Sequence, residues 1–142
     1  MNFAIRDYLP ADLDQVVALW HQCELVRPWN DPRSDISRAV SDSQSALLVA
    51  CRDDQIAGTV MVGDDGHRGW VYYLAVDPRF RRKRLGAELM SAAGDWLTRR
   101  GCPKIMLMIR MENEAVRNFY ETLEFEQEER VIMARWLVDK PG

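Results

Sequence analysis

The feature of this sequence most suited to chemistry is a short basic segment between two predicted elements. Five positive charges fall within six positions, on Arg79, Arg81, Arg82, Lys83 and Arg84. The aromatic and β-branched run 70–76 favours a strand before them, and the apolar spacing over 84–100 predicts a helix after them. A helix start presents unpartnered N–H groups and the positive end of the dipole, so phosphates bind there. We therefore expect an anion site at this junction.

Two small residues, and the absence of two common nucleotide-binding motifs, limit which class of anionic ligand this segment could bind. Gly86 and Ala87 keep the first turn of the predicted helix small, so a bulky ligand could approach its backbone. The chain contains neither GxxxxGK[ST] nor GxGxxG, which argues against a P-loop and against a dinucleotide fingerprint. The net charge of −3 makes this basic segment a local site in an acidic protein. We therefore expect no nucleic-acid partner.

The amino-acid composition argues against three further classes of protein: disulfide-rich, metal-binding and membrane proteins. Three widely spaced cysteines and two histidines predict neither a disulfide framework nor a metal site. The longest apolar run, 70–76, is far too short to cross a bilayer, and the N-terminus has no basic flank followed by an apolar stretch. These patterns predict a cytoplasmic protein without a membrane partner.

The order of the predicted elements indicates an α/β fold. Strands are expected at 3–8, 46–52, 55–62, 70–76, 104–110 and 130–138, and helices at 10–23, 33–44, 84–100 and 114–123. A helix joins strands 70–76 and 104–110, so these can be parallel neighbours in a mixed, mostly antiparallel sheet. No repeat or linker interrupts the chain, and we expect one domain over residues 1–142, with helices on both faces of the sheet.

Two motifs resemble those of the GNAT (GCN5-related N-acetyltransferase) superfamily. Residues 76–87 resemble its coenzyme A signature, Val-x-Pro-x-aromatic followed by Arg/Gln-x-x-Gly-x-Gly/Ala. Arg84 stands at the first glycine of that signature, and an arginine can take right-handed geometry at a helix start. Residues 113–125 resemble Asn-x-x-Ala-x-x-Phe-Tyr-x-x-Leu-Gly-Phe, with Glu124 in place of glycine. The stretches 25–32 and 65–69 are similar to the uncharacterised bacterial YpeA group of this superfamily.

The resemblance implies a set of site residues. Those expected to bind acetyl-coenzyme A are Leu74, Ala75, Val76, Arg81, Arg82, Lys83, Arg84, Leu85, Gly86, Ala87, Asn113 and Phe119. Tyr120 is expected to protonate the leaving thiolate, although its place beside an apolar stripe also suits a core residue. Asn113 also suits a helix cap. The expected acceptor-site residues are Trp29, Asn30, Asp31 and Tyr72, although Trp29 could simply anchor its loop.

The general base is not evident in the sequence. Family members often carry a glutamate on the strands corresponding to 70–76 and 104–110, where this chain has Tyr72, Tyr73, Met106 and Met108. The remaining candidates are Glu24, Asp31, Asp64, Asp65 and His67, the last of which we expect to be exposed.

The resemblance therefore predicts direct transfer of an acetyl group from acetyl-coenzyme A to an amine on a small molecule or peptide. The alternative is a catalytically silent coenzyme A-binding sensor or regulatory module, which the missing strand carboxylate and Arg84 favour. A third alternative is a nucleic-acid binder that uses the basic segment, and the net charge of −3 argues against it. Dimers are common in this superfamily, so a homodimer is one expected assembly.

Overall fold

The structure is a computed structural model that describes residues 2–81 and 84–141. It divides into two compact units, Met1–Leu107 and Met108–Gly142, and each is described by itself. Both units fall within the domain predicted over residues 1–142, which stays a prediction.

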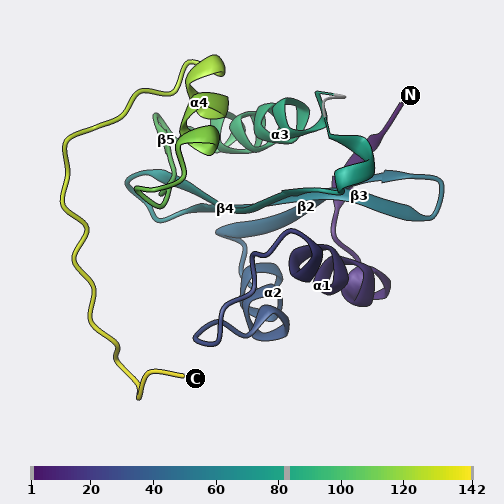
Figure 1. Ribbon diagram of the computed structural model, residues 1–142, viewed down its shortest axis with the longest axis horizontal. Coiled ribbons are helices and arrows are strands. Elements are labelled where there is room, and N and C mark those ends of the chain that lie inside the picture. The colour runs from purple at the N-terminus through teal and green to yellow at the C-terminus, as the bar shows by residue number, and fades with distance from the viewer. Residues whose placement is uncertain (1, 82–83, 142) are drawn as a thin grey trace. The chain divides into compact units, whose positions relative to one another are not determined.

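The first unit is built on a five-stranded sheet (Figure 1). Its strands are β1 (Ala4–Asp7), β2 (Ser45–Arg52), β3 (Gln55–Asp64), β4 (Gly69–Val76) and β5 (Ile105–Met106), in that spatial order. The first four are antiparallel neighbours, and β4 and β5 are parallel. The predicted mixed, mostly antiparallel sheet is confirmed, as is the parallel pairing across the helical connection.

Helices cover both faces of this sheet, as predicted (Figure 1). A short 3-10 helix, η1 (Pro10–Asp12), leads into α1 (Leu13–Gln22), which lies with α2 (Pro32–Val40) on one face. On the other face lies α3 (Leu85–Arg99). Each helix buries an apolar stripe, which for α3 consists of Leu85, Leu89, Met90, Ala93 and Leu97. The amphipathic spacing seen in the sequence is therefore what attaches the helices to the sheet.

Close contact between α3 and the sheet depends on Gly58 of β3. A Cβ atom at this position would lie 2.9 Å from Leu89 Cδ1 and 2.9 Å from the carbonyl oxygen of Ala75. Real Cβ atoms essentially never approach other atoms this closely, so a side chain here would push α3 or β4 away. Gly58 therefore helps hold α3 close to β4, beside the junction predicted to bind an anion.

The second unit contains α4 (Glu114–Thr122). Beyond the helix, the N–H of Glu124 bonds the carbonyl of Glu121 at 3.0 Å, and the N–H of Phe125 bonds the carbonyl of Tyr120 at 3.1 Å. Glu124 has a φ of 70°, which completes a Schellman cap. The αL position after this helix, where the family motif has glycine, is thus occupied by a glutamate.

Two predicted strands are corrected. The strand expected at 104–110 is only Ile105–Met106, and the described residues after α4 contain no strand where 130–138 was expected. Val131, Met133 and Leu137 are each more than 85% exposed. The apolar composition favoured a strand, but strand formation also requires a neighbouring backbone and a surface to cover the side chains. The second helix ends at Val40, four residues earlier than expected, and η1 replaces the first turn of the helix expected from residue 10.

Candidate coenzyme A and acceptor site

The outer edge of β4 separates from β5 after a short stretch of pairing. The two strands pair at Gly69–Ile105 and Trp70–Met106, where the ladder ends. Further along, the N–H of Asp77 bonds the carbonyl of Ala57 at 2.8 Å, so this residue faces β3. Because successive peptide groups in a strand point to opposite sides, the amides of Leu74 and Val76 face the outer edge.

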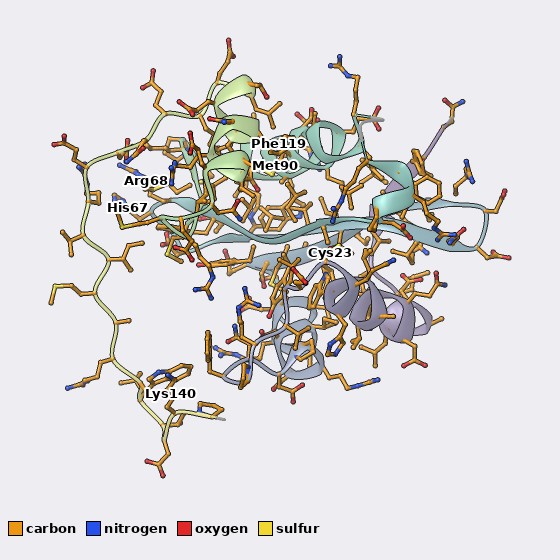
Figure 2. All side chains as sticks on the ribbon, in the orientation of Figure 1. Cys23, His67, Arg68, Met90, Phe119 and Lys140 are labelled. Carbon is orange, nitrogen blue, oxygen red and sulfur yellow. The ribbon has the colours of Figure 1, made fainter. Side chains whose placement is uncertain are left out.

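The carbonyl of Val76 supports this orientation. It accepts a hydrogen bond from Arg81 Nε at 3.3 Å and another from Cys23 Sγ at 3.5 Å. The Arg81 Nη2 atom lies 3.7 Å from the same sulfur. Figure 2 labels Cys23 on the face of the sheet covered by α1 and α2. The edge of β4, the end of α1 and the basic loop therefore meet at one place.

A β-bulge interrupts β4 just before this edge. Thr59 pairs with Ala75 and Met61 with Tyr72, so Tyr73 and Leu74 together oppose a single residue of β3. Tyr73 has a φ of 53°, a left-handed conformation that is rare for an aromatic residue. The sequence carries no signal for this bulge, because the bulged position holds no glycine.

The basic loop, which is the basic segment identified in the sequence, contains one arginine that pairs within the loop and another that is exposed. The buried carboxylate of Asp77 caps the 3-10 helix η2 (Pro78–Phe80) and accepts from Arg79 Nη2 at 2.8 Å and Nε at 3.2 Å. The Arg79 guanidinium holds the pKa of Asp77 below its usual range. Arg79 is therefore paired within the loop, whereas Arg81 is exposed at the β4 edge. Arg82 and Lys83, also predicted to bind the cofactor, lie outside the described residues.

The start of α3 follows directly. Arg84 adopts the αL conformation, with φ 64° and ψ 11°, and not the right-handed geometry that the sequence also allowed. The chain must turn sharply into the helix here, and this is the conformation that glycine supplies without a Cβ penalty. Among the described residues, no side chain caps this end of α3. The first intrahelical bond runs from the N–H of Glu88 to the carbonyl of Arg84, leaving the amides of Leu85, Gly86 and Ala87 at the open end.

The residues expected around an acceptor lie just before α2 and on β4. Trp29 and Asn30 are half-buried in the connection between α1 and α2, and Asp31 is exposed. The Asp31 side chain caps α2 by accepting from the N–H of Arg33 at 3.1 Å. Tyr72 is 45% exposed. Each of these four side chains is thus at least partly open to solvent.

Three of the candidate bases lie at the end of β3 and in the loop that leads to β4. Asp64 accepts from the N–H of Gly66 and pairs with Arg100 Nε at 3.7 Å. Asp65 accepts from the N–H groups of His67 and Arg68, at 2.8 and 2.7 Å, which holds its pKa below its usual value. Figure 2 places His67 and Arg68 together, away from Cys23. These groups shape a turn before β4, whereas the outward amides lie near its far end.

Asp35 is a carboxylate that no pattern in the sequence singled out. Its Oδ2 atom accepts a 2.6 Å hydrogen bond from the hydroxyl of Tyr73, across 38 residues of sequence. Asp35 lies in the first turn of α2, where acidic residues are common for helix-dipole reasons alone. The Tyr73–Asp35 pair forms only because of the bulge in β4 and the packing of α2, so it could not be predicted from the sequence.

In the second unit, Asn113 caps α4 by accepting from the N–H of Val116 at 3.3 Å, so its expected capping role is confirmed. Tyr120 is buried, with its ring 5.0 Å from Phe119 and 5.5 Å from Phe125 between centroids. This burial raises the pKa of Tyr120 to about 12. The phenol therefore remains protonated at neutral pH, a state that suits both a core tyrosine and a proton donor.

Comparison with known proteins agrees with this geometry. The family model described as the acetyltransferase (GNAT) family matches residues 13–125. The chain belongs to the GNAT acetyltransferase family. An acetyltransferase from Pectobacterium atrosepticum is 43% identical over 135 residues, covering 95% of this chain and 96% of the relative. An uncharacterised N-acetyltransferase from Yersinia pestis is 40% identical over 134 residues, covering 94% and 95% of the two chains.

Solved structures show the same GNAT fold. The enzyme AAC(6′)-Iy in complex with a bisubstrate analogue matches with a TM-score of 0.83 at 22% identity, covering 97% of this chain and all of that one. Glucosamine-6-phosphate N-acetyltransferase from Arabidopsis thaliana matches with a TM-score of 0.73, also at 22% identity and with the same coverage. The GNAT fold expected from the two motifs is therefore confirmed.

Two other kinds of feature are absent from the part of the GNAT chain that the structure describes. No group of three or more His, Cys, Asp or Glu side chains is arranged to hold a metal ion there. In the same residues, no helix combines the length and apolarity needed to span a membrane.

Proposed function

We propose that this GNAT protein transfers the acetyl group of acetyl-coenzyme A directly to an amine. One observation carries the proposal: among the described residues, the outer edge of β4 has no strand partner beyond Trp70, and it leads to Arg81 and to a start of α3 that no described side chain caps. An extended edge can hydrogen-bond an amide-containing arm, and an open helix start can bind phosphates. Coenzyme A carries both of these groups, an amide-containing pantetheine arm and a pyrophosphate.

The residues at this junction fit the cofactor. The amides of Leu85, Gly86 and Ala87 would hold the pyrophosphate, with Arg81 and, from the sequence, Arg82, Lys83 and Arg84 adding positive charge. Acetyl-coenzyme A supplies an acyl group on a good thiolate leaving group. The backbone of Leu74, Ala75 and Val76 would line the arm, and outward N–H groups would stabilise negative charge developing on the acyl oxygen.

The remaining roles are proposed for residues in and beside α4, on the resemblance to the family. Tyr120 would donate a proton to the departing thiolate, a role supported by its protonated state at neutral pH. Asn113 uses its side-chain oxygen as a helix cap, which leaves its NH₂ group as the donor for a cofactor contact. Phe119 would add apolar contact beside Tyr120.

The acceptor would enter from the side of α1 and α2. Trp29 offers an aromatic surface, Asn30 an amide and Asp31 an exposed carboxylate, a combination that suits a cationic amine. Tyr72 adds a half-exposed phenol from β4. AAC(6′)-Iy is named as an aminoglycoside N-acetyltransferase, and the Arabidopsis enzyme is named for glucosamine-6-phosphate. Amino sugars therefore belong in the first acceptor panel, beside polyamines and peptide N-termini.

The test has two stages. Calorimetry with acetyl-coenzyme A should show binding that weakens as salt is added, because part of the attraction is electrostatic. A thiol-release assay over the amine panel should then identify an acceptor. Absence of binding at millimolar cofactor overturns the proposal, and binding without turnover on any amine favours the silent coenzyme A sensor instead.

A further inference from the structure

The bulged residue of β4 is held by three separate elements. The Tyr73 ring stacks on Trp20 of α1, with centroids 3.7 Å apart and planes within 5°. Its carbonyl accepts a 2.9 Å hydrogen bond from Thr59 Oγ1 of β3. Its hydroxyl donates the 2.6 Å bond to Asp35 of α2. We call Trp20, Thr59 and Asp35 the Tyr73 anchor.

The anchor is itself internally bonded. Trp20 and Thr59 are both completely buried, and Trp20 Nε1 donates to Thr59 Oγ1 at 2.9 Å. The threonine hydroxyl therefore accepts a hydrogen bond from Trp20 and donates one to the carbonyl of Tyr73, which leaves it little freedom to rotate. Asp35 is the one member of the anchor that bonds the tip of the Tyr73 side chain. The pKa of Tyr73 is raised by burial and by this bond to Asp35, so the phenol stays a donor.

A bulge without such support would be costly. A left-handed conformation is unfavourable for a non-glycine residue, and it persists only where the surroundings determine it. Tyr73 lies directly before Leu74, whose amide faces the outer edge. A rotation of the Tyr73 peptide would therefore redirect the amide of the next residue. The orientation of this edge depends on the anchor.

We propose that Asp35 is a positioning residue: by holding the Tyr73 hydroxyl it fixes the bulge and aims the β4 amides at an acyl carbonyl. This inference rests on the proposed function, because it assumes that the edge binds acetyl-coenzyme A. It adds a residue of α2 that does not contact the acyl group but acts on it through Tyr73. Free coenzyme A has no acetyl carbonyl, so the two ligands differ at the position that the anchor controls.

The experiment compares the dissociation constants of acetyl-coenzyme A and free coenzyme A by calorimetry, which needs no acceptor. Tyr73→Phe removes the hydroxyl while keeping the stacked ring, and Asp35→Ala removes its partner. Each should lower the preference for the acetylated ligand about 3- to 10-fold, the effect of one misdirected hydrogen bond, and leave coenzyme A affinity unchanged. Asp35→Asn retains an acceptor oxygen and should restore most of the preference.

Two controls separate this role from general loss of structure. Tyr8→Phe removes another tyrosine hydroxyl beside the same core and should leave the preference unchanged. The double variant Tyr73→Phe/Asp35→Ala should be no worse than either single variant, because both remove the same bond. Thermal unfolding measured on every variant confirms that each remains folded at the assay temperature.

The outcomes are distinct. If the unmodified chain binds neither ligand, both this inference and the proposed function fall. If it binds both ligands equally, or if Tyr73→Phe and Asp35→Ala keep its preference, only the positioning role of Asp35 is overturned. A lost preference that Asp35→Asn restores supports the role.

Discussion

Arg6 and Asp12 form a bidentate ion pair, in which Arg6 Nη1 lies 2.7 Å from Asp12 Oδ2 and Arg6 Nη2 lies 3.0 Å from Asp12 Oδ1. The same carboxylate accepts from the N–H of Leu9 at 2.8 Å, and Asp12 is buried. The pair connects strand β1 to the turn that begins α1. It thereby fixes the helix that carries Trp20 against the sheet.

Asp12→Ala should therefore destabilise the protein. Removal of the carboxylate leaves the Leu9 amide and the partly exposed Arg6 guanidinium without this partner, a loss of about 2 kcal/mol in the free energy of unfolding. Urea denaturation measures this loss. The matched control is Asp14→Ala, whose pairing with Arg33 at 3.3 Å is exposed, and a change within about 0.5 kcal/mol is expected there. Equal effects of the two variants would contradict the assigned role of Asp12.

The same pair predicts the acid dependence of stability. The hydrogen bond from Arg6 holds the pKa of Asp12 below its ordinary value, so the folded state binds this proton less readily than the unfolded chain. The resulting stabilisation is complete above the unfolded pKa of about 3.9 and is lost as pH falls through the lower folded value. Urea midpoints measured from pH 7 to pH 2 should fall less steeply in Asp12→Asn than in the unmodified protein. Identical slopes would show that Asp12 does not contribute.

Glu124→Gly should raise stability. Glu124 occupies the αL position after α4, where a Cβ atom is unfavourable, and the relief outweighs the added freedom of glycine in the unfolded chain. A gain of about 0.5–1 kcal/mol is expected in thermal or urea unfolding. Glu121→Gly, inside the same helix, should instead lower stability by about 1 kcal/mol. A loss of stability in both variants would argue against the αL cap.

Arg81→Ala should weaken acetyl-coenzyme A binding. We expect a roughly 3- to 10-fold increase in the dissociation constant and a shallower dependence on salt, because one cation near the phosphates is removed. Arg99→Ala is the matched control, since it removes an arginine from the opposite end of α3, about 21 Å away along the helix axis. Calorimetry at two salt concentrations measures both effects. Equal weakening by the two variants would indicate a general charge effect.

Tyr120→Phe should lower kcat roughly 10- to 1000-fold, around the range for loss of a general acid, with cofactor affinity hardly changed. Because the pKa of Tyr120 is about 12, the phenol does not titrate between pH 6 and pH 10. Over that range the rate should rise as a lysine-like acceptor loses its proton. Steady-state kinetics with the acceptor from the amine panel provide the test. An unchanged kcat with lower stability would assign Tyr120 to the core alone.

The sequence by itself determined the junction between β4 and α3. The aromatic and β-branched run 70–76, the basic loop and the apolar stripe of 84–100 are local patterns, and each indicates its element without knowledge of the rest of the fold. The parallel pairing of β4 with β5 followed from the helix between them. Local patterns were equally sufficient for Asn113, whose capping role depends only on the residues that follow it.

Tertiary structure alone decided how the candidate site is oriented. Tyr73 bulges out of β4 because Trp20, Thr59 and Asp35, which are distant in sequence, bond and stack with it. Arg84 is left-handed because α3 must turn sharply to lie on the sheet. The run 130–138 formed no strand, since pairing depends on a neighbouring backbone that composition cannot specify. Each of these outcomes is set by a contact across the chain, and such contacts have no signature in the spacing of neighbouring residues.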